Sequence, residues 1–441
     1  MADDKLFNYY ERQDILPTFG NFKSSAELTA YAGQRRELFS DKLVLPARLF
    51  RDTEVLEFGP DSGENALVFA GWGANMTLAE PNRHAHPKIE AYFAHFGQAE
   101  RLRELALSDV EGFRSDRRFD VIDAEGFIYT VQPSEKWLGI FHRLLNPDGY
   151  AVVSYYERYG GFFELALKAI HAAGKVLTGR SALETAKLLF EPKWNSIPHT
   201  RSFESWLMDV LENPFVRYRY FLDAEALCTA AHEQGFDIHS AWPAYRDSLD
   251  VYWHKKVVSA DEKLRRATRH LDRSRLSFLG GRKLYLVGKA DAVSAISASI
   301  EALVLDVDRM IDEPFGDSLP RVITSLASLR ETILTTDILA DDASDIEAIT
   351  ATLDSFHRIF SAIGRRDASR DRRPHPVRPG VHRHLGAAGA FPRRPEAHRG
   401  IVASEARHWH HRNGHGRPDV PPRQFRRQSG LPRRCDCRSP T

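Results

Sequence analysis

Between residues 50 and 155, short apolar runs alternate with longer stretches in which apolar residues recur every three or four positions. The runs have the length of buried strands, and the stretches have the period of amphipathic helices. Strands that alternate with helices favour an α/β domain built on a parallel sheet. We therefore predict a doubly wound, Rossmann-like sheet of seven strands, five of which lie in this region.

The regions on either side of these strands predict additions to the domain. Residues 1–50 carry apolar residues at helical spacing and predict a helical preface, in which Tyr9 and Tyr10 either wall the site or serve as core aromatics. Residues 156–220 are rich in aromatic residues, and we expect them to form a cap over the sheet edge. Residues 222–290 predict the last two strands, over 235–242 and 283–288, as an antiparallel pair joined at Gly280 and Gly281. The main domain then spans residues 51–290.

Residues 291–364 predict three amphipathic helices with no group of catalytic side chains. Helices of this kind usually pack against a domain or against a second copy of the chain. The alternative is that the whole chain is an assembly protein that uses an enzyme fold only as a scaffold.

Residues 365–441 form a basic tail. They contain 19 arginines, no lysine and 6 acids, which gives the tail a charge of +13 and leaves −12 for the rest of the chain. The tail shows neither helical nor strand periodicity, so we expect it to be disordered and favour a frameshift as its origin. A nucleic-acid arm, or a metal site at Cys435 and Cys437 with nearby histidines, is the alternative.

The most informative stretch joins the first strand to the first helix, Val55-Leu56-Glu57-Phe58-Gly59-Pro60-Asp61-Ser62-Gly63-Glu64. Ligands of doubly wound domains bind at the carboxyl end of the first strand, where glycines let the backbone come close. A dinucleotide fingerprint would need glycine where Asp61 and Glu64 stand, and these acids would repel a pyrophosphate. No Gly-Lys-Ser/Thr follows, which excludes a phosphate-binding P-loop. An acid-rich loop suits S-adenosylmethionine, which carries a sulfonium and an ammonium and no phosphate.

Four further landmarks follow this loop in order: a strand ending at Glu80 and Pro81, Asp109 after a third strand, Phe119–Gly126, and the turn at 144–149. Together they resemble the class I S-adenosylmethionine-dependent methyltransferases over roughly residues 50–290. The departures from that family are Asp61 and Asp148, which replace glycines. The subfamily resemblance is to bacterial methyltransferases associated with surface-polysaccharide assembly.

The resemblance implies a role for each landmark. Glu57 would hold the ammonium of the cofactor, Glu80 and the following Pro81 would lie at its ribose, and Asp109 at its adenine. The glycines that would approach the cofactor are Gly59 and Gly63. Glu125, which directly follows the fourth strand, would line both the cofactor and the acceptor.

Methyl transfer to a hydroxyl needs a base, and the candidates are Glu125, Tyr155 and, from the cap, His199. Aromatic side chains in the cap would offer flat faces to a sugar ring, and Arg201, Arg217 and Arg219 would hold an anionic group. We therefore predict O-methylation of a sugar hydroxyl on a glycan or glycan precursor. The alternative is O- or N-methylation of a small aromatic or other secondary metabolite.

Bulk properties indicate a cytoplasmic enzyme. The chain has 3 cysteines, too few for a disulfide framework, and its acidic first residues do not resemble a signal peptide. No apolar run is long enough to cross a bilayer, although peripheral membrane contact stays possible for residues 162–177. The acidic folded part argues against a nucleic-acid partner. We expect no bound metal, and a homo-oligomer only through residues 291–364.

Overall fold

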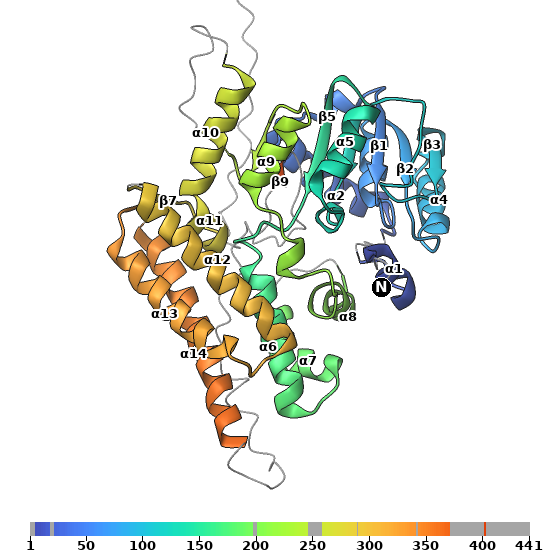
Figure 1. Cartoon of the computed structure of the whole chain (residues 1–441). Helices are drawn as coiled ribbons and strands as arrows, with labels where there is room; N and C mark the ends of the chain where they lie inside the picture. Colours follow the sequence, from blue (N-terminus) through green and yellow to red (C-terminus); the bar gives the residue numbers. More distant parts are fainter. Residues whose placement is uncertain are drawn as a thin grey trace, which may run out of the picture. The chain divides into compact units, whose positions relative to one another are not determined.

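The computed structural model describes residues 5–17, 22–196, 201–245, 258–288, 290–340, 343–370 and 401–402 (Figure 1). Five parallel strands form its central sheet, in the order β3-β2-β1-β4-β5. They are β1 (Glu54–Phe58), β2 (Asn75–Ala79), β3 (Leu102–Ala106), β4 (Phe119–Ala124) and β5 (Leu145–Ser154). The predicted α/β class and the five parallel strands are confirmed.

Helices connect these strands on both sides of the sheet, because parallel neighbours need crossover connections. They are α3 (Glu64–Gly71), α4 (His86–His95), η3 (Ala99–Arg101), η4 (Ile128–Thr130) and α5 (Ser134–Leu144). Most residues of β1, β2 and β4 are buried, as expected for the central strands of a sheet covered on both faces. The order reverses between β1 and β4, and the crevice at the carboxyl ends of these two strands is where such sheets bind ligands.

The predicted preface is helical. It contains α1 (Leu6–Gln13), α2 (Ser25–Arg36), η1 (Glu37–Lys42) and η2 (Ala47–Phe50). The side chain of Ser24 caps α2 by accepting a hydrogen bond from the backbone N–H of Glu27, and Glu27 lies in the first turn. The α2 helix contacts α3, which places the preface beside the glycine loop.

The 156–220 insertion is mainly helical. It contains α6 (Phe162–Thr178), α7 (Ala182–Trp194), α8 (Phe203–Trp206), η5 (Leu207–Leu211) and η6 (Tyr218–Tyr220). Ser181 and Glu184 form a capping box at the start of α7. The chain then returns to the sheet domain through α9 (Ala224–Glu233), which contacts α5.

The predicted antiparallel pair at the end of the domain is wrong. Within 235–242, only β6 (Ala241–Trp242) is a strand, and β7 (Leu284–Leu286) pairs instead with β8 (Ile338–Ala340) in a separate two-stranded sheet. Two helices, α10 (Ala260–Arg273) and α11 (Arg275–Gly280), precede β7. Gly281 has a φ of +59° and ends α11, so Gly280-Gly281 is a helix terminus, not a hairpin turn.

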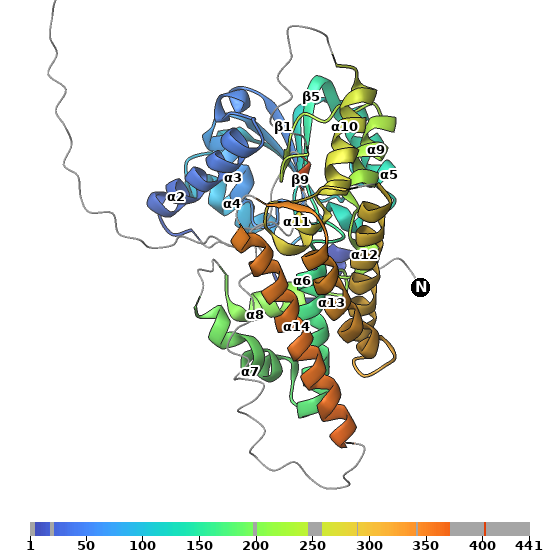
Figure 2. The ribbon, with the colours of Figure 1, turned by 90° about the vertical axis from the view of Figure 1, so that its left-hand side faces the viewer.

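Three helices follow, as predicted: α12 (Ala290–Asp312), α13 (Ser318–Thr335) and α14 (Ala343–Arg370). They pack against one another, and α12 and α14 also pack on α6 of the cap, as Figure 2 shows for α14. The rings of Phe162 and Phe163 in α6 lie 5.1 and 5.2 Å from the ring of Phe356 in α14. The apolar stripes are thus buried within the chain, and the oligomer role stays a prediction.

The boundary at residue 364 is not where the last helix ends, since α14 continues to Arg370. Residues Ile401–Val402 form a short strand, β9, between β5 and β6. The remaining tail residues, 371–400 and 403–441, with Cys435 and Cys437, lie outside the described residues. Within the part of the chain that the structure describes, no helix is long and apolar enough to cross a membrane.

Candidate functional site

The loop after β1 folds into a turn that needs left-handed backbone at three positions. Gly59, Asp61 and Gly63 have φ values of +63°, +55° and +89°. Aspartate is one of the few residues besides glycine that adopts this conformation, so Asp61 keeps the turn that the family forms with glycine. At Gly59 a side chain is also excluded by contact, because an added Cβ would lie 2.7 Å from the ring of Phe127.

Asp148 also adopts left-handed backbone at a position where the family has glycine. It replaces the first glycine of the turn before β5 and has a φ of +62°. The two departures from the family pattern therefore preserve the backbone geometry that glycine provides.

Glu80, directly after β2, holds the glycine loop in place. Its carboxylate accepts hydrogen bonds from the backbone N–H of Asp61 at 3.0 Å and of Asn82 at 2.7 Å. Burial raises the pKa of Glu80 to about 8, and the two N–H donors oppose that rise. A carboxylate has about four acceptor positions, so these two bonds leave capacity for a ligand hydroxyl. Pro81 is half-buried beside it, and the predicted ribose contacts of both stay predictions.

Three acids gather at the carboxyl ends of β1 and β4: Glu57, Asp123 and Glu125. One carboxylate oxygen of Glu57 (Oε2) and both of Asp123 are buried without a hydrogen-bond partner among the described residues. Burial raises the pKa of Glu57 well above its usual range, and Glu125 raises it further. The pKa of Asp123 is raised in the same way, by burial and then by Glu125 and Glu57. Buried carboxylates with unused oxygens call for a cation.

Arg35, in α2 of the preface, supplies one cation to this acid cluster. Its Nη1 and Nη2 donate to the two carboxylate oxygens of Glu125, at 3.0 and 2.6 Å. The side chain is fully buried, and its guanidinium lies 4.8 Å from the ring centre of Phe39 and 5.4 Å from that of Phe69. A bidentate pair of this kind fixes both side chains in orientation as well as in position.

The sequence analysis gave no role to Arg35, which falls at helical spacing with Tyr31 and Leu38. A charged residue in an otherwise apolar stripe was the available signal, because arginine is almost never buried unless it is paired.

Asp109 lies in the loop after β3, as predicted, and contacts the preface. Lys5 Nζ is 2.5 Å from its carboxylate and 3.0 Å from that of Glu111. From the same preface, the Tyr9 hydroxyl donates to the Met208 carbonyl at 2.8 Å, and that of Tyr10 donates to Asp209 at 2.7 Å. Both tyrosines thus bind cap residues, and α1 links the cap to the edge of the sheet that carries the acids.

Tyr155, another predicted base, is not in the acid cluster. The Tyr155 hydroxyl is 2.5 Å from that of Tyr245, both rings are buried, and burial raises the pKa of Tyr155 well above its usual range. His199 lies outside the described residues. Of the two base candidates that the structure describes, it brings Glu125, and not Tyr155, beside Glu57 and Asp123.

The cap side chains expected to face a substrate bind within the chain instead. Arg201 pairs with Asp209 at 2.6 Å, and Arg217 pairs with Asp308 and Asp312 of α12. The Arg219 guanidinium lies 4.7 Å from the ring centre of Tyr220. Trp194 is buried against Phe203 and Trp206, as expected if the aromatics build the core of the cap. The prediction that Arg201 and Arg217 bind an anionic ligand is corrected, because carboxylates of the chain already neutralise them.

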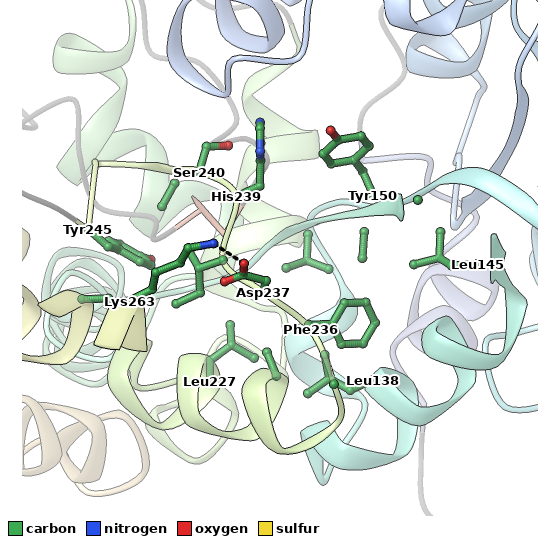
Figure 3. Close-up of a pocket in the computed structure, with 18 of the residues that line it drawn as sticks. Leu138, Leu145, Tyr150, Leu227, Phe236, Asp237, His239, Ser240, Tyr245 and Lys263 are labelled. Atoms are coloured by element: carbon green, nitrogen blue, oxygen red, sulfur yellow. Dashed lines mark hydrogen bonds and ion pairs between the residues drawn. The ribbon is translucent and has the colours of Figure 1, made fainter. Parts of the chain in front are cut away.

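A large cavity, of about 1620 Å³, is lined by residues of α5, β5, α9 and α10 and by none of the three acids (Figure 3). Its lining includes Leu145 and Tyr150 of β5, Phe236, and Asp237, which pairs with Lys263 of α10. These residues surround the first half of β5, whereas Glu57, Asp123 and Glu125 lie at or just beyond the carboxyl ends of their strands. The cavity therefore does not belong to the acid cluster. Among the described residues, no group of three or more histidines, cysteines or acids is placed to hold a metal.

Three solved structures illustrate the likeness to known folds. The CcbJ methyltransferase from Streptomyces caelestis is 20% identical, with 26% of this chain and 49% of that chain covered and a TM-score of 0.24. The N-methyltransferase NodS from Bradyrhizobium japonicum WM9, in complex with S-adenosyl-l-homocysteine, is 16% identical, with 35% and 74% covered and a TM-score of 0.27. PKMT2 from Rickettsia typhi, in complex with AdoHcy, is 20% identical, with 46% and 42% covered and a TM-score of 0.32.

The chain thus spans about half of CcbJ and less than half of PKMT2. At these TM-scores the likeness supports no conclusion about function. No curated protein matches the chain. The family model described as a methyltransferase domain matches residues 31–241, a segment that includes Arg35, the glycine loop, all five parallel strands and the cap. Over these residues, the chain is similar to a methyltransferase domain.

Proposed function

We propose that this chain is an S-adenosylmethionine-dependent methyltransferase. The observation that carries the proposal is the acid cluster at the switch point of the sheet, where Glu57 and Asp123 keep buried oxygens that have no hydrogen-bond partner in the part of the chain that the structure describes. Such a cluster is costly unless a cation completes it, and this one adjoins a glycine turn that a ligand can approach closely. The match of residues 31–241 to a methyltransferase domain supports the same function.

The residues present fit this cofactor group by group. Glu57 would bind its ammonium, and Arg35 would bind its carboxylate, because a buried guanidinium beside buried acids is the natural partner of an amino-acid group. Glu80 would accept from the ribose hydroxyls, and Asp109 would lie near the adenine. Gly59 and Gly63 leave the turn without side chains at these two positions. When bound, the cofactor supplies a methyl group on a sulfonium, which is an electrophile.

The acceptor that we propose is a sugar hydroxyl of a glycan or glycan precursor, modified in the cytoplasm. The proposal rests on the resemblance to polysaccharide-assembly methyltransferases and on Glu125, a carboxylate at the acid cluster that is able to take the proton of a hydroxyl. Arg201 and Arg217 do not contribute, since both are neutralised within the chain. An O- or N-methyltransferase of a small aromatic or secondary metabolite is the alternative.

Calorimetric titration with S-adenosylmethionine and S-adenosylhomocysteine tests the function directly. Glu57→Gln should weaken binding by about 1.5–3 kcal/mol, the usual contribution of a hydrogen bond to a charged group. The matched control is Glu54→Gln, at the other end of the same strand, where the side chain accepts from Asn75 at 2.8 Å. This control should bind like the wild type. A wild-type protein that binds neither ligand would instead be a scaffold with an enzyme fold.

A further inference from the structure

The Arg35–Glu125 pair joins two parts of the site that have different tasks. Arg35 comes from the preface, and Glu125 from the segment directly after β4. Both terminal nitrogens of the guanidinium are used by the two oxygens of this one carboxylate. The side chains are 0% and 10% exposed, so little water is available to replace either partner.

The charges around this pair show how strongly the cluster depends on Arg35. Glu57 and Asp123 lie close enough for the guanidinium to stabilise their ionised forms, although both carboxylates are deeply buried. The same guanidinium therefore partly neutralises three acids, and it binds one of them, Glu125, through two hydrogen bonds. A further carboxylate that entered the cluster would need a cation, and Glu125 already uses both terminal nitrogens of Arg35.

We propose that Glu125 and the carboxylate of the amino-acid group of the cofactor compete for Arg35, so that cofactor binding breaks the Arg35–Glu125 pair. This inference rests on the proposed function, because it assigns the same site. It gives Glu125 two states. Without cofactor it is held by Arg35, and with cofactor it is released toward the acceptor.

The competition has a consequence for the order of binding. A carboxylate held by a guanidinium on both oxygens is fixed in orientation as well as in position. Glu125 is able to turn toward the acceptor only after Arg35 has left it. The cofactor should therefore bind before the acceptor, and the Arg35–Glu125 pair should lower the affinity for the cofactor.

Binding measurements on the full chain test this without knowledge of the acceptor. The probes are S-adenosylhomocysteine and its decarboxylated analogue, which keeps the amine and lacks the carboxylate. Glu125→Gln should bind S-adenosylhomocysteine about tenfold more tightly than the wild type, because a neutral amide competes weakly for Arg35. The affinity for the decarboxylated analogue should not rise.

The matched control is Asp123→Asn, which removes one charge from the same cluster and leaves the Arg35–Glu125 hydrogen bonds intact. This variant should not raise the affinity for either ligand. Arg35→Met should lower the affinity for S-adenosylhomocysteine and should change the affinity for the decarboxylated analogue much less. If Glu125→Gln does not fold, Glu125→Asp serves in its place, since the shorter side chain cannot reach both nitrogens.

Three results would overturn the proposal. The first is unchanged or weaker S-adenosylhomocysteine binding in the Glu125 variant, and the second is an equal gain in affinity for both ligands in that variant. The third is an equal gain in affinity for S-adenosylhomocysteine in Asp123→Asn. Each of these leaves the proposed function intact if the wild type binds S-adenosylhomocysteine. A wild type that does not bind it removes the proposed function, and the competition with it.

Discussion

The guanidinium of Arg217 in the cap binds the carboxylate of Asp308 in α12 through two hydrogen bonds, Nε to Oδ1 at 2.8 Å and Nη2 to Oδ2 at 3.1 Å. Asp312, one turn further along the helix, accepts two more from the same group. The cap and the C-terminal helices are therefore joined by an ion pair as well as by the apolar contacts of α6. Arg217, which the sequence analysis expected to bind an anionic group, thus has a structural role.

Replacing Arg217 should therefore destabilise the fold. In Arg217→Met, Asp308 and Asp312 would face each other without their cation, and we expect a loss of about 1–3 kcal/mol in the free energy of unfolding. Urea unfolding measures it. Arg309→Met is the control on the same helix, because Arg309 is exposed and its partner Asp306 also binds Arg321; it should change stability by less than about 0.5 kcal/mol. Equal effects of the two substitutions would contradict the structural role.

Gly59 and Gly97 separate backbone strain from steric contact. Both have positive φ, +63° and +67°, but an added Cβ meets the Phe127 ring at Gly59 and nothing within 4 Å at Gly97. Gly97→Ala should cost about 1–2 kcal/mol, the usual penalty for a left-handed residue with a side chain. Gly59→Ala should cost more and should also weaken S-adenosylhomocysteine binding, which Gly97→Ala should leave unchanged. Thermal unfolding measures the stability of both variants, and calorimetry measures their affinity for S-adenosylhomocysteine. Equal stability losses would show that the Phe127 ring moves aside at little cost.

The sequence predicts those parts of this site whose residues lie close together along the chain. Glu57, Gly59 and Gly63 belong to one local strand–turn–helix motif, so their arrangement follows from the order of residue types. The pair between Arg35 and Glu125 spans 90 positions and depends on how α2 packs beside the sheet, which no local pattern specifies. Arg217 was misread for the same reason, since its partners lie 91 and 95 positions further along the chain.

The wrong prediction at the end of the domain has a local cause. A Gly-Gly pair before a short apolar run is typical of a hairpin turn, but glycine with positive φ also ends helices. The residues before Gly281 form α11, and the pairing of β7 with β8 depends on residues more than 50 positions away. Local patterns do not separate these two uses of glycine.

Glu157 should make stability depend on pH. Its Oε2 accepts from the N–H groups of Tyr159 and Gly160, each at 2.8 Å, and burial raises its pKa to about 8, against the opposing effect of Arg275. Because the folded-state pKa lies above the unfolded value of 4.5, the folded protein binds the proton more tightly. Its stabilising contribution is full below pH 4.5 and is lost as the pH rises toward 8.

The free energy of unfolding, measured in urea between pH 5 and 8, should thus fall less steeply in Glu157→Gln than in the wild type. The difference in slope should reach up to about 1.4 kcal/mol per pH unit, the limit for one proton. Glu100→Gln, at an exposed glutamate, should keep the wild-type slope. Parallel curves for Glu157→Gln and the wild type would show that this carboxyl does not titrate differently in the folded state.

A substitution at Phe356 tests whether the C-terminal helices fold together with the sheet domain or form an independent module. The ring is fully buried and packs on both Phe162 and Phe163, so α6 and α14 share one apolar core. Phe356→Ala should therefore cost about 3–5 kcal/mol, the range for removing a buried aromatic ring. Leu334→Ala, at a half-exposed position of α13, should cost little, because its side chain is already largely in water.

Urea unfolding and size-exclusion chromatography follow both variants. If α12–α14 were an independent module, Phe356→Ala would produce a separate early transition and leave the unfolding of the sheet domain unchanged. Since Phe356 belongs to the same buried apolar cluster as Ile122 of β4 and Val153 of β5, we expect instead one transition that moves as a whole.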